Sequence, residues 1–421
     1  MGRRDMGDVP LCAPRRPGTR RPPAKREKIM AKVGLREWLA VGRVIASGRL
    51  ARYGGPGEGP LDRFENAFSE KFGIKHVLTV SSGTGALISA LAASGVGPGD
   101  EVLVPAYTWI ATAAAVLAVG AVPVIVDIDE TLTMDPEDIV RKLTRHTRAV
   151  LPVHMANMVC DMEAITEHAR QHGLLVIEDA CQAVGASYRD RRVGTIGDIG
   201  AFSFNQFKNI NIGEGGAVAS QSDRFFARAR MYHDVGELFR GHLDHYNEPS
   251  FFGVNFKASQ IQGAMLNVQL AKLDPMLRRM RRRHQVMSHI LSGSDAFRLG
   301  PHNDPQNAVG LHLVFETEGE AKAFAAQHKR GVYRVFDSSR HVCTHWAPIL
   351  EKRAFHPAMN PYGWASADVT YGPDMCARSL DILKRTCRIS LGENYPTALM
   401  AYLARRMAGQ GAPERRLSYA A

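Results

Sequence analysis

A lysine, an aspartate and a short Ser-Gly-Thr sequence are the residues of this 421-residue chain whose types and spacing suit chemistry. Lys208 stands between the apolar residues Phe202-Ser203-Phe204 and the glycine-rich turn Gly213–Gly216. A lysine held in such a place is partly buried, and its amine can act as a nucleophile that forms a Schiff base with a carbonyl. Because most lysines are surface charges, the position of Lys208 alone does not decide its role.

Asp179 follows the largely apolar run Leu174–Glu178 and so stands at the carboxyl end of a predicted strand. A carboxylate buried there needs a partner, and the protonated ring nitrogen of a cofactor would supply one. The sequence equally allows an acid that caps the next turn.

Ser82-Gly83-Thr84 directly follows a predicted strand and opens a predicted helix. Backbone N–H groups at a helix start, together with the helix dipole, favour a bound phosphate. Ser and Thr at a helix start are also typical of a plain N-terminal cap.

The elements that position these residues alternate along the chain. We predict strands and helices in turn at 76–80, 86–94, 101–104, 108–119, 122–128, 136–143, 149–153, 162–172 and 174–178. This alternation predicts an α/β fold with a mostly parallel central sheet sandwiched by helices. Ligands bind such sheets at the carboxyl ends of the strands, which is where the candidate residues fall.

The length of the chain favours more than one domain. Helical patterns cover 33–51, 61–72 and 256–287, and short strands and helices are mixed from residue 311 onward. We predict a disordered basic leader at 1–32, a large cofactor-binding domain at 33–285 and a small C-terminal α+β domain at 286–421.

Charge and composition exclude several classes of protein. The net charge is +11, but residues 1–30 hold nine Lys or Arg against three Asp or Glu, so the rest of the chain is only mildly basic and no nucleic-acid partner is expected. The six cysteines lack C-x-x-C spacing, which indicates reduced thiols in a cytoplasmic protein. No apolar stretch approaches the roughly 18 residues of a membrane span.

Six segments in this order, SSGTGAL, PAYTWIATAAAV, AVPVIVDID, IEDACQAVGA, GDIGAFSFNQFKN and GEGGAV, form a specific joint pattern. From about Leu61 to Leu273 the chain resembles the DegT/DnrJ-type sugar aminotransferases. These are fold type I enzymes of the aspartate aminotransferase superfamily, which use pyridoxal 5'-phosphate. A weaker resemblance, to the eight-carbon-sugar (octulosonate) branch of the family, rests on VHM, EDACQA, GTIGD, the region 233–245 and the HW-containing tail together.

The resemblance implies a role for each matching position. It makes Lys208 the catalytic lysine that holds the cofactor as a Schiff base, and Asp179 the partner of the pyridine nitrogen. It places Gln182 at the phenolic oxygen of the ring and Trp109 against the ring face. The phosphate would be held by Ser82, Gly83, Thr84 and Ser203.

The segment Gly253–Lys257 resembles a family motif whose asparagine, here Asn255, reaches the cofactor phosphate of the neighbouring subunit. The resemblance therefore implies a homodimer with shared active sites. The chain departs from the motif at Lys257, where Arg is usual, and at Gln260, where Glu is common. It departs again after His154, in a loop near the substrate side.

The resemblance implies ping-pong transfer of an amino group from glutamate or glutamine to a keto sugar. Alternatives are a keto-cyclitol aminotransferase, a sugar dehydratase, in which histidine usually replaces the lysine, and a non-catalytic regulator that binds the cofactor. We expect His154, His345 and Trp346 to contact substrate, although a packed core explains the last two equally well. A metal site at His341, His345 and His356 is not expected.

Overall fold

The computed structural model describes residues 33–53, 58–236, 248–329, 331–365, 369–372, 374–391 and 396–409. These residues lie in one compact unit, Val33–Ala421. The leader predicted at 1–32 lies outside the described residues. Within the described part of the chain, no helix is long and apolar enough to cross a membrane.

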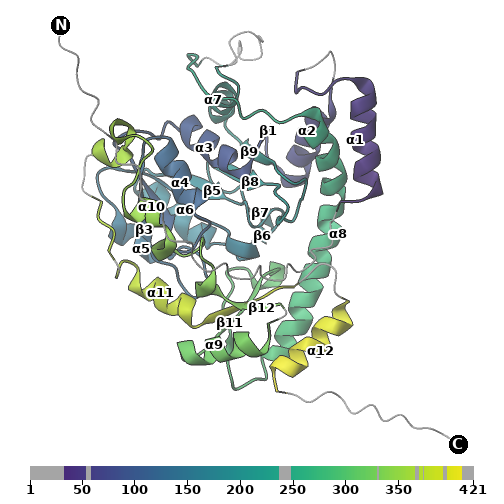
Figure 1. Cartoon of the computed structure of the whole chain (residues 1–421), viewed down its shortest axis with the longest axis vertical. Coiled ribbons are helices and arrows are strands. Elements are labelled where there is room, and N and C mark those ends of the chain that lie inside the picture. Colours follow the sequence, from purple (N-terminus) through teal and green to yellow (C-terminus); the bar gives the residue numbers. More distant parts are fainter. Residues whose placement is uncertain are drawn as a thin grey trace, which may run out of the picture. The chain divides into compact units, whose positions relative to one another are not determined.

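A seven-stranded sheet forms the centre of the fold, in the order β1-β9-β8-β5-β4-β2-β3 (Figure 1). Its four pairings between β8 and β3 are parallel, and β9 runs antiparallel to both of its neighbours. The predicted mostly parallel sheet is therefore confirmed. The strands are β1 (His76–Val80), β2 (Glu101–Pro105), β3 (Val122–Val126), β4 (Thr147–Val150), β5 (Leu175–Asp179), β8 (Ile199–Ser203) and β9 (Gly216–Ser220).

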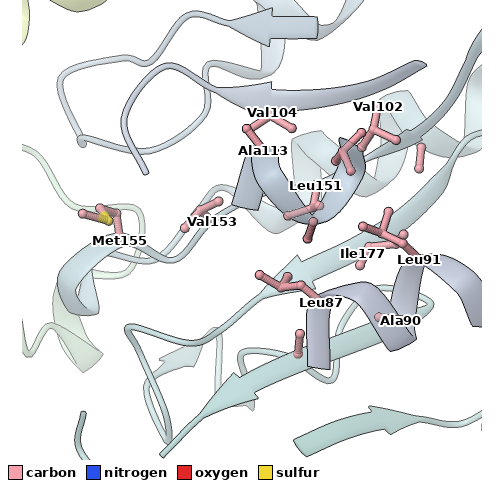
Figure 2. Close-up of a cluster of buried hydrophobic side chains, with 14 of the residues drawn as sticks. Leu87, Ala90, Leu91, Val102, Val104, Ala113, Leu151, Val153, Met155 and Ile177 are labelled. Carbon is pink, nitrogen blue, oxygen red and sulfur yellow. The ribbon is translucent and has the colours of Figure 1, made fainter. Parts of the chain in front are cut away.

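Helices cover both faces of this sheet, because successive side chains of a strand point to opposite faces and both sets are apolar. Val102 and Val104 of β2 join one buried cluster, whereas Leu103 between them joins another. The first cluster includes side chains of α3 (Gly83–Ala93) and α4 (Ala111–Ala118), and Figure 2 shows these gathered with side chains of β2 and β5. The second includes side chains of α2 (Pro60–Phe72), α5 (Pro136–Lys142), α6 (Met162–Gln171) and α8 (Gln260–Leu291).

Helix α8 connects the central sheet with the C-terminal part of the chain. It begins at a capping box, in which Ser259 accepts the N–H of Gln262 while the Gln262 side chain accepts the N–H of Ser259. Its first half packs beside α1 (Leu35–Ser47) and α2, and its second half packs with α12 (Thr397–Met407) (Figure 1). The predicted domain boundary after residue 285 falls within this helix, so the division of the chain there remains a prediction.

The C-terminal part is built on a second, four-stranded antiparallel sheet in the order β10-β11-β13-β12. A third buried cluster joins this sheet to Met287 and Leu291 at the end of α8. A smaller α+β part is thus present, as the fold class predicted. Its elements are β10 (Arg298–Leu299), β11 (Leu311–Val314), α9 (Glu318–Gln327), β12 (Val332–Arg334), α10 (Ala347–Leu350), α11 (Ala377–Lys384), β13 (Thr386–Ile389) and α12.

The remaining regular elements are α7 (Asp223–His233) and the short ribbon of β6 (Ser187–Tyr188) and β7 (Arg191–Arg192). Most predicted elements occur within a few residues of their expected bounds. The long helix α8 runs four residues later than the predicted 256–287, and shifts of three residues concern the two helices next to the candidate site. Helix α3 begins at Gly83 instead of residue 86, and α4 begins at Ala111 instead of residue 108.

Candidate active site

A cavity of about 530 Å³ opens at the carboxyl ends of the parallel strands of the large sheet. Side chains from the loops after β1, β2, β4, β5 and β8 line one side of it, and the C-terminal part lines the other. Eight of the predicted cofactor and catalytic residues line this cavity: Ser82, Gly83, Thr84, Trp109, Asp179, Gln182, Ser203 and Lys208.

The start of α3 and the end of β8 form one corner of the cavity. The Ser82 hydroxyl accepts the N–H of Gly85 at 2.9 Å, so Ser82 is the N-terminal cap that the sequence left as an alternative. A cap satisfies only part of a helix start, and the other N–H groups of the first turn stay available for an anion. A Cβ added at Gly83 would lie 2.6 Å from Cβ of Ser203, so glycine is required for α3 to begin beside this hydroxyl.

Asp179 ends β5 and is only 3% exposed. One carboxylate oxygen accepts the hydroxyl of Thr112 at 2.8 Å, and the other accepts the N–H of Cys181 at 3.0 Å. The Thr112 hydroxyl is also within 2.7 Å of the Thr108 hydroxyl. These contacts fix the orientation of a buried carboxylate at the wall of the cavity.

Lys208 lies in the loop after β8, half-buried at the wall of the cavity. The loop is anchored by Asn209, whose side-chain amide donates to Asn157 Oδ1 at 2.8 Å and to the Val184 carbonyl at 2.9 Å. Burial raises the pKa of the neighbouring Cys181 thiol well above its usual range, with the charge of Asp179 adding to this and that of Lys208 opposing it. Lys208 and Asp179 therefore act on one small, enclosed region.

Trp109 follows β2 and is 38% exposed, with its ring at the cavity. The ring centroid lies 5.1 Å from that of His341, and the Arg340 guanidinium lies 5.6 Å from it. Gln182 lines the cavity between the Asp179 and Lys208 segments, and its backbone carbonyl accepts the N–H of Asn157 at 3.0 Å.

The opposite wall contains four polar residues that the sequence analysis did not assign to the site: Tyr333, Ser338, His341 and Arg388. The Arg388 guanidinium lies over the Tyr333 ring at 4.9 Å, on paired strands of the small sheet. The Ser338 hydroxyl is hydrogen-bonded to Nδ1 of His341. Burial, with the charges of Arg388 and Lys208, lowers the pKa of His341 to about 4, so its imidazole is neutral at pH 7.

The expected substrate contact of His154 is wrong. This side chain is fully buried and does not line the cavity. Its Nδ1 accepts the N–H of Cys160 at 3.1 Å, so the proton is on Nε2, which donates to Glu178 at 3.0 Å. Hydrogen bonds from His154 and from the backbone of Gly197 and Gly194 lower the pKa of Glu178 although burial opposes this, so the pair is a structural support beneath Asp179.

The expected substrate contacts of His345 and Trp346 also fail. Trp346 is fully buried in the first apolar cluster, and its indole N–H donates to the Arg340 carbonyl at 3.1 Å. His345 is exposed outside the described cavity, with its ring centroid 5.4 Å from that of Phe336. The segment of residues 340–346 does reach the cavity, but through the side chain of His341.

Asn255 is exposed and lies outside the cavity of its own chain, and its Oδ1 accepts the N–H of Lys257 at 3.2 Å. The Lys257 ammonium is paired with Asp234. Among the described residues, no group of three or more His, Cys, Asp or Glu side chains is arranged to hold a metal ion.

The cavity fits pyridoxal 5'-phosphate. The helix start with Ser203 suits the phosphate, the buried carboxylate of Asp179 suits a protonated ring nitrogen, and the Trp109 ring suits the ring face. Lys208 supplies an amine at the same cavity. When bound, the cofactor supplies an electron sink for reactions at the carbon that carries the amino group.

Comparison with known proteins gives relatives that align with more than half of this chain. The GDP-perosamine synthase of Caulobacter vibrioides is 43% identical over 218 residues, which are 51% of this chain and 57% of that protein. An L-glutamine:2-deoxy-scyllo-inosose aminotransferase of Micromonospora echinospora is 41% identical over 58% of this chain and 60% of its own length. These alignments thus span about three fifths of each relative.

The similarity extends further in three dimensions. The crystal structure of S. venezuelae DesV in complex with a ketimine intermediate has a TM-score of 0.72 and 30% identity, over 90% of this chain and 95% of that one. The model of the DegT/DnrJ/EryC1/StrS aminotransferase family matches residues 36–337. With this match and the lysine, carboxylate and phosphate seat in one cavity, the chain belongs to the DegT/DnrJ/EryC1/StrS aminotransferase family.

Proposed function

We propose that this protein transfers an amino group from glutamate or glutamine to a keto sugar, with pyridoxal phosphate bound in the cavity and Lys208 as the catalytic residue. The observation that carries the proposal is the convergence of Lys208, Asp179 and the Ser203 corner on one cavity. Three segments more than 20 residues apart in the sequence meet there, at or shortly after the ends of β1, β5 and β8: residues 82–84, Asp179 and residues 203–208.

The residues of the chain divide the work in this proposal. Lys208 holds the cofactor and, once an amino donor has displaced it, moves a proton to and from the reacting carbon as general acid and base. Asp179 keeps the ring nitrogen protonated, and the two hydrogen bonds to its oxygens keep it in place. Trp109 covers the ring face and limits access of water.

The polar wall opposite Lys208 supports a substrate with several hydroxyl groups. His341 is neutral at pH 7, so it can accept as well as donate hydrogen bonds, and Tyr333 and Ser338 add hydroxyls. A keto cyclitol presents a similar ring of hydroxyls. The relatives that act on a GDP-linked sugar and on 2-deoxy-scyllo-inosose keep both substrate classes in the proposal.

Amino transfer is favoured over sugar dehydration because Lys208 is present and lines the cavity. The same observation disfavours a regulator that only binds the cofactor, since such a protein needs no proton-transferring amine.

We also propose a homodimer in which Asn255 serves the site of the partner subunit. Its exposure and its position outside the cavity of its own chain support this. Mixing Lys208→Ala protein with Asn255→Ala protein should then restore activity, because some hybrid dimers carry one intact site. Two variants that stay inactive after mixing would contradict shared sites. The free, buried cysteines of the described part support a cytoplasmic protein.

The two half-reactions test the proposed function. Glutamate or glutamine added to the cofactor-loaded protein should convert the spectrum of the lysine-bound cofactor to that of its amino form. A panel of keto sugars and keto cyclitols should then reverse the change. If only simple α-keto acids restore the spectrum of the lysine-bound cofactor, the sugar assignment is refuted. If no amino donor changes the spectrum, amino transfer is refuted.

A further inference from the structure

A short antiparallel ribbon joins the loop that carries Trp109 to the C-terminal part of the chain. Residues 106–110 run beside residues 340–343, with Tyr107 and Val342 forming a β-bridge. Three backbone hydrogen bonds close the ribbon: Thr108 N–H to the His341 carbonyl (2.9 Å), Ile110 N–H to the Arg340 carbonyl (3.0 Å) and Cys343 N–H to the Ala106 carbonyl (2.9 Å).

Trp346 anchors this ribbon from the core. Its indole N–H donates at 3.1 Å to the Arg340 carbonyl, the same oxygen that accepts the N–H of Ile110. The indole has one donor and no acceptor, so this bond uses its whole hydrogen-bonding capacity. Because Trp346 is 0% exposed, the surrounding core fixes its position and through it the Arg340 carbonyl.

The ribbon determines where the Trp109 ring can lie. Trp109 lies between Thr108 and Ile110, whose N–H groups are both bonded to the opposite strand. Its ring contacts the side chains of Arg340 and His341. A shift of the Arg340 carbonyl would therefore move the backbone of Ile110 and the ring contacts of Trp109 together.

We infer that Trp346 is a positioning residue that holds Trp109 in place for the cofactor through the Arg340 carbonyl. The inference rests on the proposed contact between Trp109 and the cofactor ring. The match to the family model ends at residue 337, so Trp346 and the C-terminal strand of the ribbon lie beyond it.

The first test compares Trp346→Phe with Trp364→Phe. The first change removes the N–H donor and keeps an aromatic ring, and the second makes the same change at a tryptophan of the C-terminal part that is 37% exposed. Cofactor affinity is measured by titrating the apoprotein with pyridoxal phosphate and following the absorbance of the lysine-bound form. We expect Trp346→Phe to raise Kd by about tenfold, or 1.4 kcal/mol, and Trp364→Phe to leave it unchanged.

A double-mutant cycle separates positioning from general loosening of the core. Trp109→Ala should weaken cofactor binding by itself, and Trp346→Phe should add little in that background. Additive effects, or equal effects of the two Trp→Phe changes, would overturn the inference. If Trp109→Ala does not weaken binding, the proposed role of Trp109 fails instead, so the two failures are distinguishable.

Hydrogen exchange tests the inference first on the unmodified protein, without a variant. Cofactor binding should slow exchange of the Thr108, Ile110 and Cys343 amides, because a ring held by the ribbon also stabilises the ribbon. In Trp346→Phe the same amides should exchange faster, while those of α3 keep their rate. If cofactor binding leaves the exchange rates of these ribbon amides unchanged, the inference is overturned, even if the variant does not fold.

Discussion

The two walls of the cavity are built in different ways. The wall with Lys208 and Asp179 consists of residues at or shortly after the ends of strands of the mostly parallel sheet, and sequence motifs predicted which residues come together there. The opposite wall comes from β12, β13 and the irregular turns around His341, and the sequence pointed to the wrong side chains there. The end of a regular strand predicts the position of a site residue to within a few residues. In an irregular segment, only tertiary packing determines where each side chain points.

The largest effect is expected on the wall with Lys208 and Asp179, which we call the cofactor wall. Lys208→Ala should abolish the absorbance of the lysine-bound cofactor and lower turnover by about 1,000-fold or more, because anchor and proton-transfer group are lost together. Absorbance spectra and steady-state rates measure both. Lys329→Ala, at an exposed lysine outside the cavity, is the matched control, and the comparison between the walls would break if the two lysine variants behaved alike.

The next effect concerns support beneath that wall. His154→Ala should lower the free energy of unfolding by about 3 kcal/mol, because the buried Glu178 carboxylate loses its Nε2–H donor and a cavity is left. Denaturant unfolding measures this loss. A variant with normal stability and a raised KM for the keto substrate would restore the substrate role that the structure denies to His154.

The opposite wall should show a moderate effect on substrate alone. His341→Ala should raise KM for the keto substrate by about tenfold, the size of one or two lost hydrogen bonds in a polar site. The amino-donor half-reaction should change less. His345→Ala is the control, because this histidine is exposed outside the cavity. Equal KM values for the two variants would mean that the turns around His341 do not form the substrate wall.

The smallest effect lies where the C-terminal part meets the central one. Burial lowers the pKa of His302 and of His312 to about 4, and Nε2 of His312 is bonded to the Glu130 carbonyl after β3. Both folded pKa values lie below the ordinary 6.5, so the unfolded chain binds more protons as pH falls from 6.5 toward 4. Each histidine should therefore cost about 1 kcal/mol of stability between pH 6.5 and about pH 5.5.

Urea unfolding at these two pH values measures the slope. His312→Gln should reduce it, because an amide does not titrate in this range, while His172→Gln, at an exposed histidine, should leave it unchanged. An acid sensitivity that is the same in both variants would assign the loss to other groups.

The sequence by itself determined the sheet and the cofactor wall. Short apolar runs alternating with helical patterns predict parallel strands, and the carboxyl ends of parallel strands meet at one edge. Lys208, Asp179, Trp109 and Ser203 therefore had to lie close together, and the structure shows that they do. Local pattern and global fold give the same answer in this region.

Only the tertiary structure decided which side chains form the opposite wall of the cavity. His341 and Trp346 are five residues apart in one irregular segment, and no periodicity tells that the first reaches the cavity and the second the core. Arg388 lies in a strand whose partners come from residues 311–314 and 332–334, and its direction depends on that pairing. His154 was misassigned because its hydrogen-bond partners are Cys160, whose N–H it accepts, and Glu178, to which it donates. These two residues meet it only when β5 and the loop after β4 pack together.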